Sequence, residues 1–359
     1  MYTVALEVHN IKNLATGFGT FNYGLISGLS RINIDGLKII LCAQKPVDSL
    51  FEKKFGFHKV YSFSRYKMMR PFKKFDLWHS VNQNTKIEPR NCGKYLLTIH
   101  DVNFVEAILP DKNHKRYVAF LEKLHRADAI TYISKYAKEQ THTYFDVPKV
   151  PEFIIYNGNP INKILDTTTF QPQVPTDQPY LYSIGDFLHK KNFGSIVKMM
   201  NHLPNYNLII SGNHNKPYGQ EIKNLITEHA LENRVFLTGK VDNAGKQYYM
   251  KNCEAFVFPS TGEGFGLPPI EAMRFGRPIY LSDKTSLPEV GGDHCFYWNR
   301  FDPEYMASVF NDGMAKYNAN SNFYSEIYKA RAAEFNWDVA AQQYLDVYRL
   351  LLLNEPVSF

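Results

Sequence analysis

The sequence predicts an α/β protein with sheets of parallel strands. Short apolar runs rich in β-favouring residues alternate along the 359-residue chain with stretches of helical spacing. Several of these runs end in a glycine-containing loop that leads directly into a predicted helix, and residues 255–276 are the clearest example. Such alternation favours strands joined by crossover helices, and the chain is long enough for two domains of ordinary size.

Composition excludes several broad classes of protein. Hydrophobic residues make up 44% and charged residues 21% of the chain, values typical of a globular protein and not of a disordered one. The four cysteines are widely spaced, without the CxxC pattern of a zinc site, as is typical of reduced thiols: Cys42, Cys92, Cys253 and Cys295. The acid at Glu7 comes too early for a signal peptide, and no apolar run approaches the length of a membrane span. We therefore expect a cytoplasmic protein, and the net charge of +6 is compatible with an acidic substrate or a membrane surface.

A candidate phosphate site lies in the middle of residues 255–276. The predicted strand 255–258 is followed by a loop with glycines at positions 262, 264 and 266, which leave backbone N–H groups without side-chain cover. Two prolines then suit the first turn of a helix, and a glycine at position 276 suits its end. A strand, a glycine loop and a helix N-terminus together form the usual place where an α/β sheet holds phosphate.

Two carboxylates in this segment indicate that phosphate is only part of the ligand. Glu263 lies in the predicted loop, and Glu271 is predicted in the first helical turn. A carboxylate is a poor neighbour for phosphate, but it accepts hydrogen bonds strongly from sugar hydroxyls. A nucleotide-sugar, with phosphates between two hydroxyl-rich rings, fits both requirements. The alternative is a plain glycine turn in which Glu271 only complements the helix dipole.

The string Glu-Gly-Phe-Gly-Leu-Pro-x-x-Glu, residues 263–271, resembles the E-x7-E signature of retaining glycosyltransferases of family 4. The resemblance implies the GT-B fold: two Rossmann-like domains that face each other across a deep cleft, and a C-terminal helix that crosses back to the N-terminal domain. On this basis residues 1–165 form an acceptor-binding domain and residues 166–340 a domain that binds the nucleotide-sugar. Residues 341–359 then form the helix that packs back on the first domain.

A pair of lysines is predicted to meet the diphosphate. The predicted strand 180–184 leads into Gly185 and a loop that ends with Lys190 and Lys191, just before a helix, where charge and backbone dipole both attract an anion. A solvated surface pair is the alternative. Family members usually show Gly followed directly by Arg, with Lys six residues after the Gly. Lys191 matches that Lys, Lys190 replaces the charge of the Arg, and Asp186, at the position of the Arg, has no assigned role.

The first domain contains a second glycine-containing loop. Gly17 and Gly19 lie in a predicted loop between a strand at residues 2–8 and a helix at residues 21–29, where their backbone can approach a diphosphate. A simple turn is the alternative, although family 4 enzymes commonly have a glycine-containing loop at this place. A Rossmann oxidoreductase is disfavoured because Asn22 stands where the third glycine of its fingerprint would be.

His100 is predicted at the carboxyl end of a strand, the edge where open α/β sheets bind ligands. A buried structural histidine is the alternative. Family 4 enzymes often have a histidine at the end of the equivalent strand, close to the donor sugar, so the resemblance implies that His100 faces the cleft. Asp101 is expected to order the loop.

The resemblance implies a site made of residues from both domains. The implied catalytic residues are Glu263, Lys191 and His100. In the family, the turn at residues 239–241 lies against the nucleotide base. The implied donor-binding residues are Gly17, Gly19, Gly185, Lys190, Lys191, Gly239, Lys240, Val241, Glu263, Gly264, Phe265, Gly266, Leu267 and Glu271.

The predicted reaction needs neither a metal ion nor another cofactor. The sequence has no Asp-x-Asp pair, so lysines and the N–H groups of residues 264–267 are expected to stabilise the leaving diphosphate. The resemblance implies that a hexose-type sugar moves, with retention, from a nucleotide diphosphate sugar to a glycan or lipid-linked acceptor in cell-surface polysaccharide or glycolipid synthesis. We favour front-face transfer, and Glu263 as a covalent nucleophile is the alternative. A GT-B sugar-nucleotide epimerase and a non-catalytic sugar-nucleotide-binding protein are competing functions.

Residues 51–75 form a basic-aromatic stretch. Eight lysines or arginines oppose the single acid Glu52, with Tyr61, Phe63, Tyr66, Met68, Met69 and Phe72 between them. Such a stretch suits an anionic bilayer, here the inner face of the membrane, or a lipid-linked acceptor, and a solvated loop is the alternative. Interleaved basic and aromatic residues also suit single-stranded nucleic acid, but nothing else in the sequence supports that partner, and no nucleic acid is expected.

Overall fold

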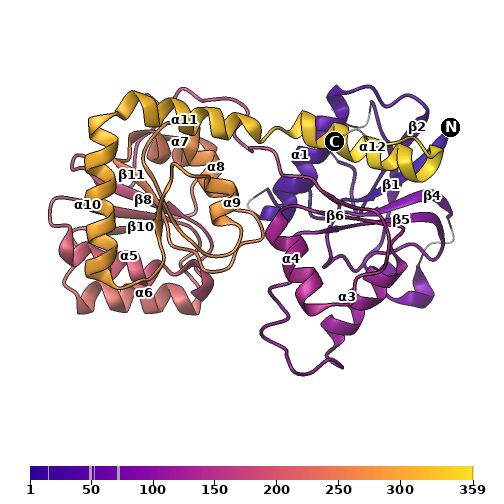
Figure 1. The fold of residues 1–359 in the computed structure, drawn as a ribbon, viewed down its shortest axis with the longest axis horizontal. Coiled ribbons are helices and arrows are strands. Elements are labelled where there is room, and N and C mark those ends of the chain that lie inside the picture. The colour runs from indigo at the N-terminus through magenta and orange to yellow at the C-terminus, as the bar shows by residue number, and fades with distance from the viewer. Residues whose placement is uncertain (15, 48–50, 52, 71–72, 358) are drawn as a thin grey trace. The chain divides into compact units, whose positions relative to one another are not determined.

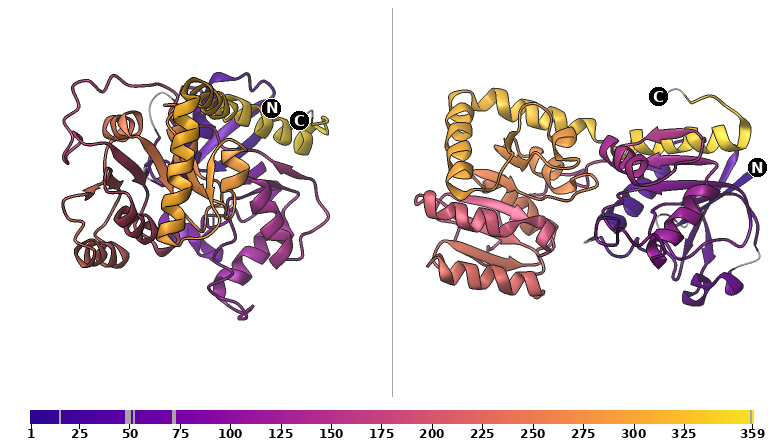
Figure 2. Two further views of the ribbon diagram at one scale, coloured as in Figure 1. Left: turned by 60° about the vertical axis from the view of Figure 1, so that its left-hand side comes forward. Right: turned by 60° about the horizontal axis from the view of Figure 1, so that its bottom comes forward.

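A computed structural model describes residues 1–14, 16–47, 51, 53–70, 73–357 and 359. The chain divides into two compact units, one formed by residues 1–160 with 336–359 and the other by residues 161–335. Each unit is built around a sheet of parallel strands, which confirms the predicted α/β class (Figure 1). Figure 2 shows from two further directions that helices flank the strands of each unit.

The first unit has a seven-stranded sheet in the order β3-β2-β1-β4-β5-β6-β7. Its strands are β1 Tyr2–Glu7, β2 Leu37–Ala43, β3 Gly56–Lys59, β4 Phe75–Ser80, β5 Cys92–Ile99, β6 Ala129–Tyr132 and β7 Glu152–Ile154. Its helices are α1 Gly17–Arg31, α3 Lys115–Arg126, α4 Lys135–Tyr144 and α12 Trp337–Leu353, with short 3-10 turns η1 Ser62–Arg65 and η2 Lys67–Met69. From β1 the chain first adds β2 and β3 on one side of the sheet, and then adds β4 to β7 on the other side. The strand order therefore reverses between β1 and β4, and the connections that leave these two strands diverge there.

The C-terminal helix α12 begins at Trp337, four residues before the predicted segment 341–359, and ends at Leu353 within it; it packs against α1 within the first unit. Two glycines of α1 allow the close approach. A Cβ at Gly24 would lie 2.1 Å from the Trp337 ring, and a Cβ at Gly28 would lie 2.3 Å from the Trp337 carbonyl oxygen. Further along α12, the buried Tyr348 hydroxyl lies 2.8 Å from Nδ1 of His79 on β4. The helix therefore completes the core of this unit.

The second unit has a six-stranded sheet in the order β10-β9-β8-β11-β12-β13. Its strands are β8 Tyr180–Ile184, β9 Asn207–Ser211, β10 Val235–Gly239, β11 Ala255–Phe258, β12 Ile279–Ser282 and β13 Phe296–Trp298. Its helices are α5 Phe193–Met199, α6 Pro217–Glu228, α7 Asn243–Asn252, α8 Leu267–Met273, α9 Leu287–Gly291, α10 Pro303–Ala319 and α11 Ser321–Glu334, with 3-10 turns η3 His189–Lys191 and η4 Met200–His202. Here the reversal falls between β8 and β11.

Helices cover both faces of the second sheet, as its apolar strands require. On one face α5, α6 and α10 contribute a core that includes Phe193, Ile222 and Phe310. On the other face α7, α8 and α11 contribute a core that includes Tyr249 and Met273. Both faces of strands such as β11 are therefore buried, and their residues are apolar throughout.

Two local predictions were wrong. Gly17 and Gly19 lie in the first turn of α1 and not in a loop, because Thr16 caps the helix by accepting a hydrogen bond from the Gly19 N–H at 3.2 Å. Glu271 is the fifth residue of α8 and not part of its first turn, because the helix begins at Leu267, directly after Gly266 with φ +117°. A left-handed conformation of this kind favours glycine.

Candidate functional site

The loops that follow β8 and β11 lie at the strand reversal of the second sheet. The loop after β8 contains Gly185, Lys190 and Lys191, and the loop after β11 contains Glu263. In open parallel sheets the carboxyl ends of strands at such a reversal are the usual place for a ligand. The structure therefore brings several predicted donor-binding residues to this point.

Lys191 and Glu263 are in direct contact. The Lys191 Nζ atom lies 2.5 Å from Oε1 of Glu263, and the two side chains are only 12% and 13% exposed. Ser260 donates a hydrogen bond from its hydroxyl to the same carboxylate oxygen at 2.6 Å. The ammonium group also lies 4.9 Å from the centroid of the Phe258 ring, the last residue of β11. Two of the three predicted catalytic residues thus form one largely buried ion pair.

The charge of Glu263 is maintained by its neighbours. Burial by itself would raise the pKa of this carboxyl group, but the positive charges of Lys191 and Lys190 outweigh that effect and lower the pKa below its usual value. The hydrogen bonds from Lys191 and Ser260 act in the same direction. Glu263 is therefore ionised at neutral pH and can accept hydrogen bonds from ligand hydroxyls.

Backbone contacts hold the two loops together. The carbonyl of Lys190 accepts hydrogen bonds from the Ser260 hydroxyl at 3.0 Å and from the Thr261 N–H at 2.7 Å. Two glycines lie close to the lysine stems. A Cβ at Gly262 would lie 3.4 Å from the Lys190 side chain, and one at Gly185 would lie 3.3 Å from Cε of Lys191. Both lysine stems therefore lie along the backbone of the glycine positions in the two loops.

Thr285 and Ser286, which precede α9, support the glycine loop, and the sequence analysis gave them no such role. The Glu263 N–H donates to the Thr285 hydroxyl at 3.1 Å. The Ser286 hydroxyl donates to the carbonyls of Glu263 at 3.1 Å and Phe265 at 2.8 Å. Phe265 is itself buried and packs edge-to-face on Phe335 at 5.5 Å. Hydroxyl residues just after a strand were the only sequence signal for these contacts.

Glu271 has a partner that the sequence analysis missed. Lys246 on α7 lies 2.6 Å from Oε1 of Glu271, and the Glu271 side chain is buried. Asp186, which had no assigned role, lies 3.0 Å from Nζ of Lys216, next to α6. The Asp186 pair is more exposed than the Lys246–Glu271 pair. The role of Glu271 towards a ribose stays a prediction.

The turn after β10 lies at the same carboxyl edge of the second sheet. Gly239, with φ +74°, accepts a hydrogen bond at its carbonyl from the Gly212 N–H at 2.8 Å. Lys240 follows with an exposed side chain, and Val241 packs against the core below α7. The proposed contact of these residues with a nucleotide base stays a prediction.

His100 belongs to the first unit, where it follows β5. Its side chain is buried, its Nε2 atom lies 2.9 Å from the Val81 carbonyl oxygen, and its ring meets Phe18 and Phe21 edge-on. Burial lowers the pKa of His100 to about 4, so the ring is neutral at neutral pH. These contacts fit the structural alternative as well as a ligand role, and a contact between His100 and the donor sugar stays a prediction.

Comparison with known proteins points to one kind of enzyme. Residues 166–329 match the family model of group 1 glycosyl transferases. The chain is 25% identical over 289 residues to the O-antigen chain mannosyltransferase B of Escherichia coli, a match that covers 73% of this chain and 72% of that protein. It is 28% identical over 221 residues to the O-antigen chain mannosyltransferase RfbU of Salmonella typhimurium, with 60% of each chain covered. It is also 29% identical over 270 residues to the serotype-specific mannosyltransferase WbdA of Escherichia coli, of which it covers 32%.

Solved structures show the same fold over nearly the whole chain. Sucrose-phosphate synthase from Thermosynechococcus elongatus superposes with a TM-score of 0.72 at 18% identity, with 99% of this chain and 100% of that chain covered. HepE from Anabaena, solved in complex with UDP and glucose, superposes with a TM-score of 0.67 at 14% identity, with 97% of this chain and 99% of that chain covered. Together with the family match and the curated relatives, this likeness supports a glycosyltransferase with the GT-B fold.

Proposed function

We propose that the protein is a retaining glycosyltransferase that moves a hexose from a nucleoside diphosphate sugar to a glycan or lipid-linked acceptor during cell-surface polysaccharide synthesis. The observation that carries this proposal is the buried Lys191–Glu263 ion pair at the strand reversal of the second sheet. Both residues lie within the part of the chain that matches group 1 glycosyl transferases.

The chemistry of sugar transfer explains why this pair suits the donor. Cleavage of the anomeric C–O bond leaves negative charge on the diphosphate, while positive charge develops on the sugar. In our proposal the ammonium groups of Lys190 and Lys191 stabilise the departing diphosphate. Each preorganised donor of this kind typically contributes about 3 kcal/mol to the lowering of the barrier. Glu263 would hold Lys191 in place and accept hydrogen bonds from the sugar hydroxyls.

We propose that transfer proceeds without a metal ion. The sequence has no Asp-x-Asp pair. Among the residues that the structure describes, no group of three or more His, Cys, Asp and Glu side chains is arranged to hold a metal. Lysines are the available source of positive charge beside the proposed diphosphate site, since Lys191 lies next to Glu263 and Lys190 borders Gly262.

The names of the curated relatives give the first donor to test. Several are mannosyltransferases of O-antigen synthesis, so we propose mannose as the transferred hexose. A panel of nucleoside diphosphate sugars should be screened for thermal stabilisation of the purified protein, because a ligand that binds the folded state raises the unfolding temperature. The best donor is then incubated with a panel of methyl glycosides. Sugar transfer to a glycoside supports the proposal. Release of an epimerised donor, or binding without any transfer, would point to the competing functions.

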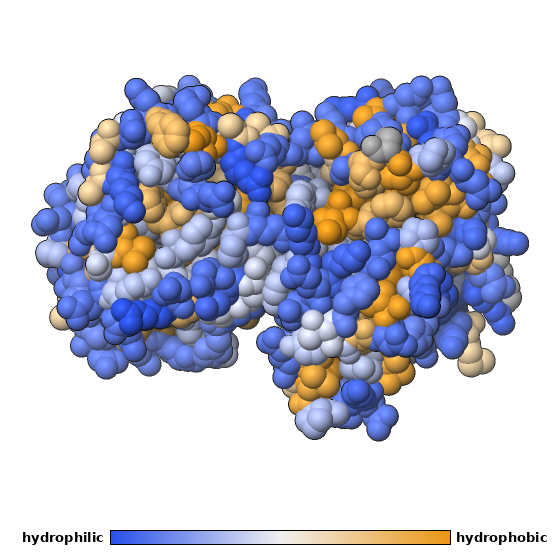
Figure 3. Space-filling model, in the orientation of Figure 1, coloured by the Kyte–Doolittle hydropathy of each residue, from blue (hydrophilic) through white to orange (hydrophobic). Residues whose placement is uncertain are grey.

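We also propose that the first unit rests on an anionic membrane through a basic-aromatic surface. We define this surface as Tyr61, Phe63, Tyr66, Met68 and Met69 together with Lys59, Arg65 and Lys67. All five apolar side chains are exposed, Met68 at 88% and Tyr66 at 63%. Figure 3 shows apolar residues gathered in several patches on the visible face of this unit. Glu52 and Phe72 of the predicted stretch lie outside the described residues.

The composition of this surface favours contact with lipid headgroups over simple exposure to water. Exposed apolar side chains in such density mark interaction sites, and nearby cations are attracted to anionic headgroups. Between Lys53 and Arg70 the sequence contains no acid that would oppose this attraction. Over the described residues, no helix has both the length and the apolar character needed to span a bilayer. Contact at the lipid surface is therefore the form of membrane association that we propose.

A further inference from the structure

The strand reversal of the first sheet carries a cluster of polar residues that the proposed donor chemistry does not use. Glu7 is the last residue of β1, and the loop after β4 runs past Asn82 and Thr85. β1 and β4 are the strands between which the order reverses, as β8 and β11 are in the second sheet. The Lys191–Glu263 pair lies at the strand reversal of the second sheet. The strand reversal of the first sheet is therefore a further candidate position for a ligand site.

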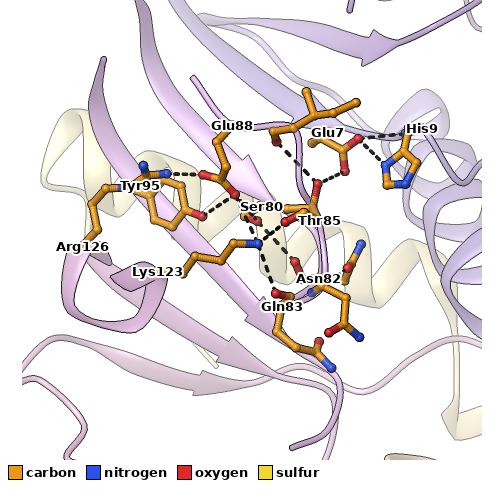
Figure 4. Close-up of polar contacts among 12 residues, drawn as sticks. Glu7, His9, Ser80, Asn82, Gln83, Thr85, Glu88, Tyr95, Lys123 and Arg126 are labelled. Atoms are coloured by element: carbon orange, nitrogen blue, oxygen red, sulfur yellow. Dashed lines mark hydrogen bonds and ion pairs between the residues drawn. The ribbon is translucent and has the colours of Figure 1, made fainter. Parts of the chain in front are cut away.

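Glu7 is a fully buried carboxylate that is held on both of its oxygens (Figure 4). Its Oε1 atom accepts hydrogen bonds from the backbone N–H of His9 at 3.2 Å and from Nδ1 of the same histidine. Its Oε2 atom accepts a hydrogen bond from the Thr85 hydroxyl at 2.7 Å. Burial of a carboxylate is costly unless it is paired, so this arrangement fixes the His9 ring on the carboxyl end of β1.

The loop after β4 is anchored by a second set of buried charges. Lys123 of α3 donates hydrogen bonds to the carbonyls of Gln83, at 3.1 Å, and of Thr85, and its Nζ lies 3.4 Å from Glu88. Glu88 in turn pairs with Arg126 and accepts a hydrogen bond from the Tyr95 hydroxyl at 3.0 Å (Figure 4). The loop is therefore rigid where it meets Glu7.

At this point one exposed hydrogen-bonding group is available to a ligand, and one buried group lacks a partner. The His9 side chain is 31% exposed, and with Nδ1 committed to Glu7 its Nε2 has no partner among the described residues. The Asn82 side chain is buried, and within the described chain its Nδ2 amide group has no hydrogen-bond partner. Buried amide groups are rarely left unpaired in folded proteins, and an enclosed water is the partner that such a donor takes.

We infer that His9, oriented by the buried carboxylate of Glu7, binds a hydroxyl group of the sugar acceptor at the carboxyl end of β1. The inference rests on the proposed function for the identity of the ligand as an acceptor. A hydroxyl group both donates and accepts hydrogen bonds, so it suits the ring in either protonation state. Glu7 is a positioning residue because it acts through His9.

The charge environment is consistent with this role. Burial lowers the pKa of His9, but the hydrogen bond and the negative charge of Glu7 outweigh burial and the opposing charge of Lys123, so the pKa is raised overall. In the neutral ring, Nδ1 donates to Glu7 and Nε2 accepts a hydrogen bond from the ligand. In the protonated ring, both nitrogens donate.

The test is a titration of the full-length protein, labelled with 15N-histidine, with methyl glycosides of mannose, glucose, galactose and N-acetylglucosamine. The His9 ring signals are assigned by their loss in His9→Gln. At least one glycoside is expected to shift these signals, and His9→Gln is expected to weaken its binding about tenfold, the size of one hydrogen bond to a partly charged group. Glu7→Gln is expected to weaken binding and to lower the pKa of the His9 ring, while thermal unfolding shows that the variant folds.

A matched control is available in the same unit. His142 also contacts a carboxylate, with its Nε2 2.7 Å from Oε2 of Glu152, but Glu152 begins β7 and so lies at the amino end of an edge strand. His142→Gln is expected to leave glycoside binding unchanged.

Three outcomes would overturn the inference: no glycoside shifts the His9 signals, His142→Gln weakens binding as much as His9→Gln, or only inorganic phosphate shifts them. These readouts do not depend on a donor. Failure of the proposed function would instead be seen as absence of nucleotide-sugar binding and transfer, so the two failures are distinguishable.

Discussion

At the scale of single residues, the Lys191–Glu263 pair places two opposite charges where water has little access. Such a pair is weak evidence for stability, because the cost of removing both charges from water offsets much of their attraction. Its position is more informative, since the two residues come from loops that leave β8 and β11 at the strand reversal. A ligand that carries both anionic and hydroxyl groups can use both partners.

The first prediction concerns catalysis by this pair. Lys191→Ala and Glu263→Ala are each expected to reduce sugar transfer by about a hundredfold or more, the loss typical for one preorganised electrostatic group. Because loss of one partner leaves a buried charge unpaired, the double variant Lys191→Met/Glu263→Gln is measured beside them, with circular dichroism as the check on folding. Lys216→Met, which breaks the exposed pair with Asp186, is the matched control and should keep wild-type turnover. Wild-type turnover in either alanine variant would show that the residue has no catalytic role.

The second prediction follows from the lowered pKa of Glu263. A carboxyl group with a lower pKa in the folded state contributes stability that is present above its unfolded pKa, about 4.3, and is lost as pH falls through the folded pKa. The unfolding temperature of the wild type should therefore exceed that of Glu263→Gln at pH 7, and the difference should shrink as the pH falls below about 4. Melting curves of both proteins from neutral to acidic pH measure this. A difference that is independent of pH would contradict the assigned charge state.

At the scale of helices and strands, the contact between α1 and α12 depends on glycine. We predict that Gly24→Ala destabilises the first unit by about 1–3 kcal/mol, because the new Cβ would collide with the Trp337 ring and force both helices apart. Gly17→Ala on the same helix is the control, since a Cβ there meets nothing within 4 Å. Chemical denaturation of the two variants gives the comparison, and equal stability would contradict the described packing.

The basic-aromatic surface defined above gives a second prediction at this scale. We predict that the wild type sediments with vesicles of phosphatidylcholine and phosphatidylglycerol but not with phosphatidylcholine alone, and that added salt weakens binding by screening the charges. The triple variant Tyr66→Ser/Met68→Ser/Met69→Ser should lose this binding. Phe323→Ser on α11, which removes another exposed aromatic residue, should keep it. Equal sedimentation of the triple variant would contradict a membrane role for this surface.

Several strands of the second unit were predictable because their signals are local. Residues 180–184, 207–211 and 255–258 are short apolar runs bounded by Gly or Pro, and the structure has strands with these bounds. No strand was predicted at β4, because Asp76 and His79 are residue types that are less often fully buried than apolar ones. His79 is nevertheless buried, because its ring nitrogens meet the hydroxyls of Tyr348 and Thr98, partners that are remote in sequence.

The polar contacts of the candidate site also join residues whose pairing the sequence does not reveal. The E-x7-E string indicated Glu263 and Glu271, but no spacing in the sequence relates Lys246 to Glu271, since they belong to α7 and α8. Likewise the hydrogen bond from Thr85 to Glu7 depends on β1 and β4 becoming neighbours in the sheet. Sequence patterns identify groups with the right chemistry, and only the strand order determines which of them meet.

At the scale of the whole molecule, the same topology recurs in the two units, and each places polar residues at its strand reversal. The second unit offers lysines and a carboxylate, which suit a diphosphate sugar, and the first unit offers His9, which suits a hydroxyl group. This division of chemistry is what transfer between a nucleotide-sugar and a sugar acceptor requires. It needs no metal ion if the lysines neutralise the diphosphate.

The last of the predictions tests the proposed role of the lysines. Because ammonium groups replace a metal in our account, sugar transfer should keep its rate when EDTA is added, and added Mg²⁺ or Mn²⁺ should not raise it. Initial rates of the purified protein with the best donor, with and without chelator, provide the measurement. Strong inhibition by EDTA that the metal reverses would mean that a cation stabilises the leaving group.

We propose above that a nucleotide-sugar is bound by Lys190, Lys191 and Glu263 at the strand reversal of the second sheet. A crystal structure of the full chain with its best-stabilising donor would locate the bound sugar and diphosphate. We expect the diphosphate oxygens within hydrogen-bonding distance of the Lys190 or Lys191 ammonium group, and a sugar hydroxyl on the Glu263 carboxylate. A donor bound elsewhere, with the Lys191–Glu263 pair untouched, would contradict the account.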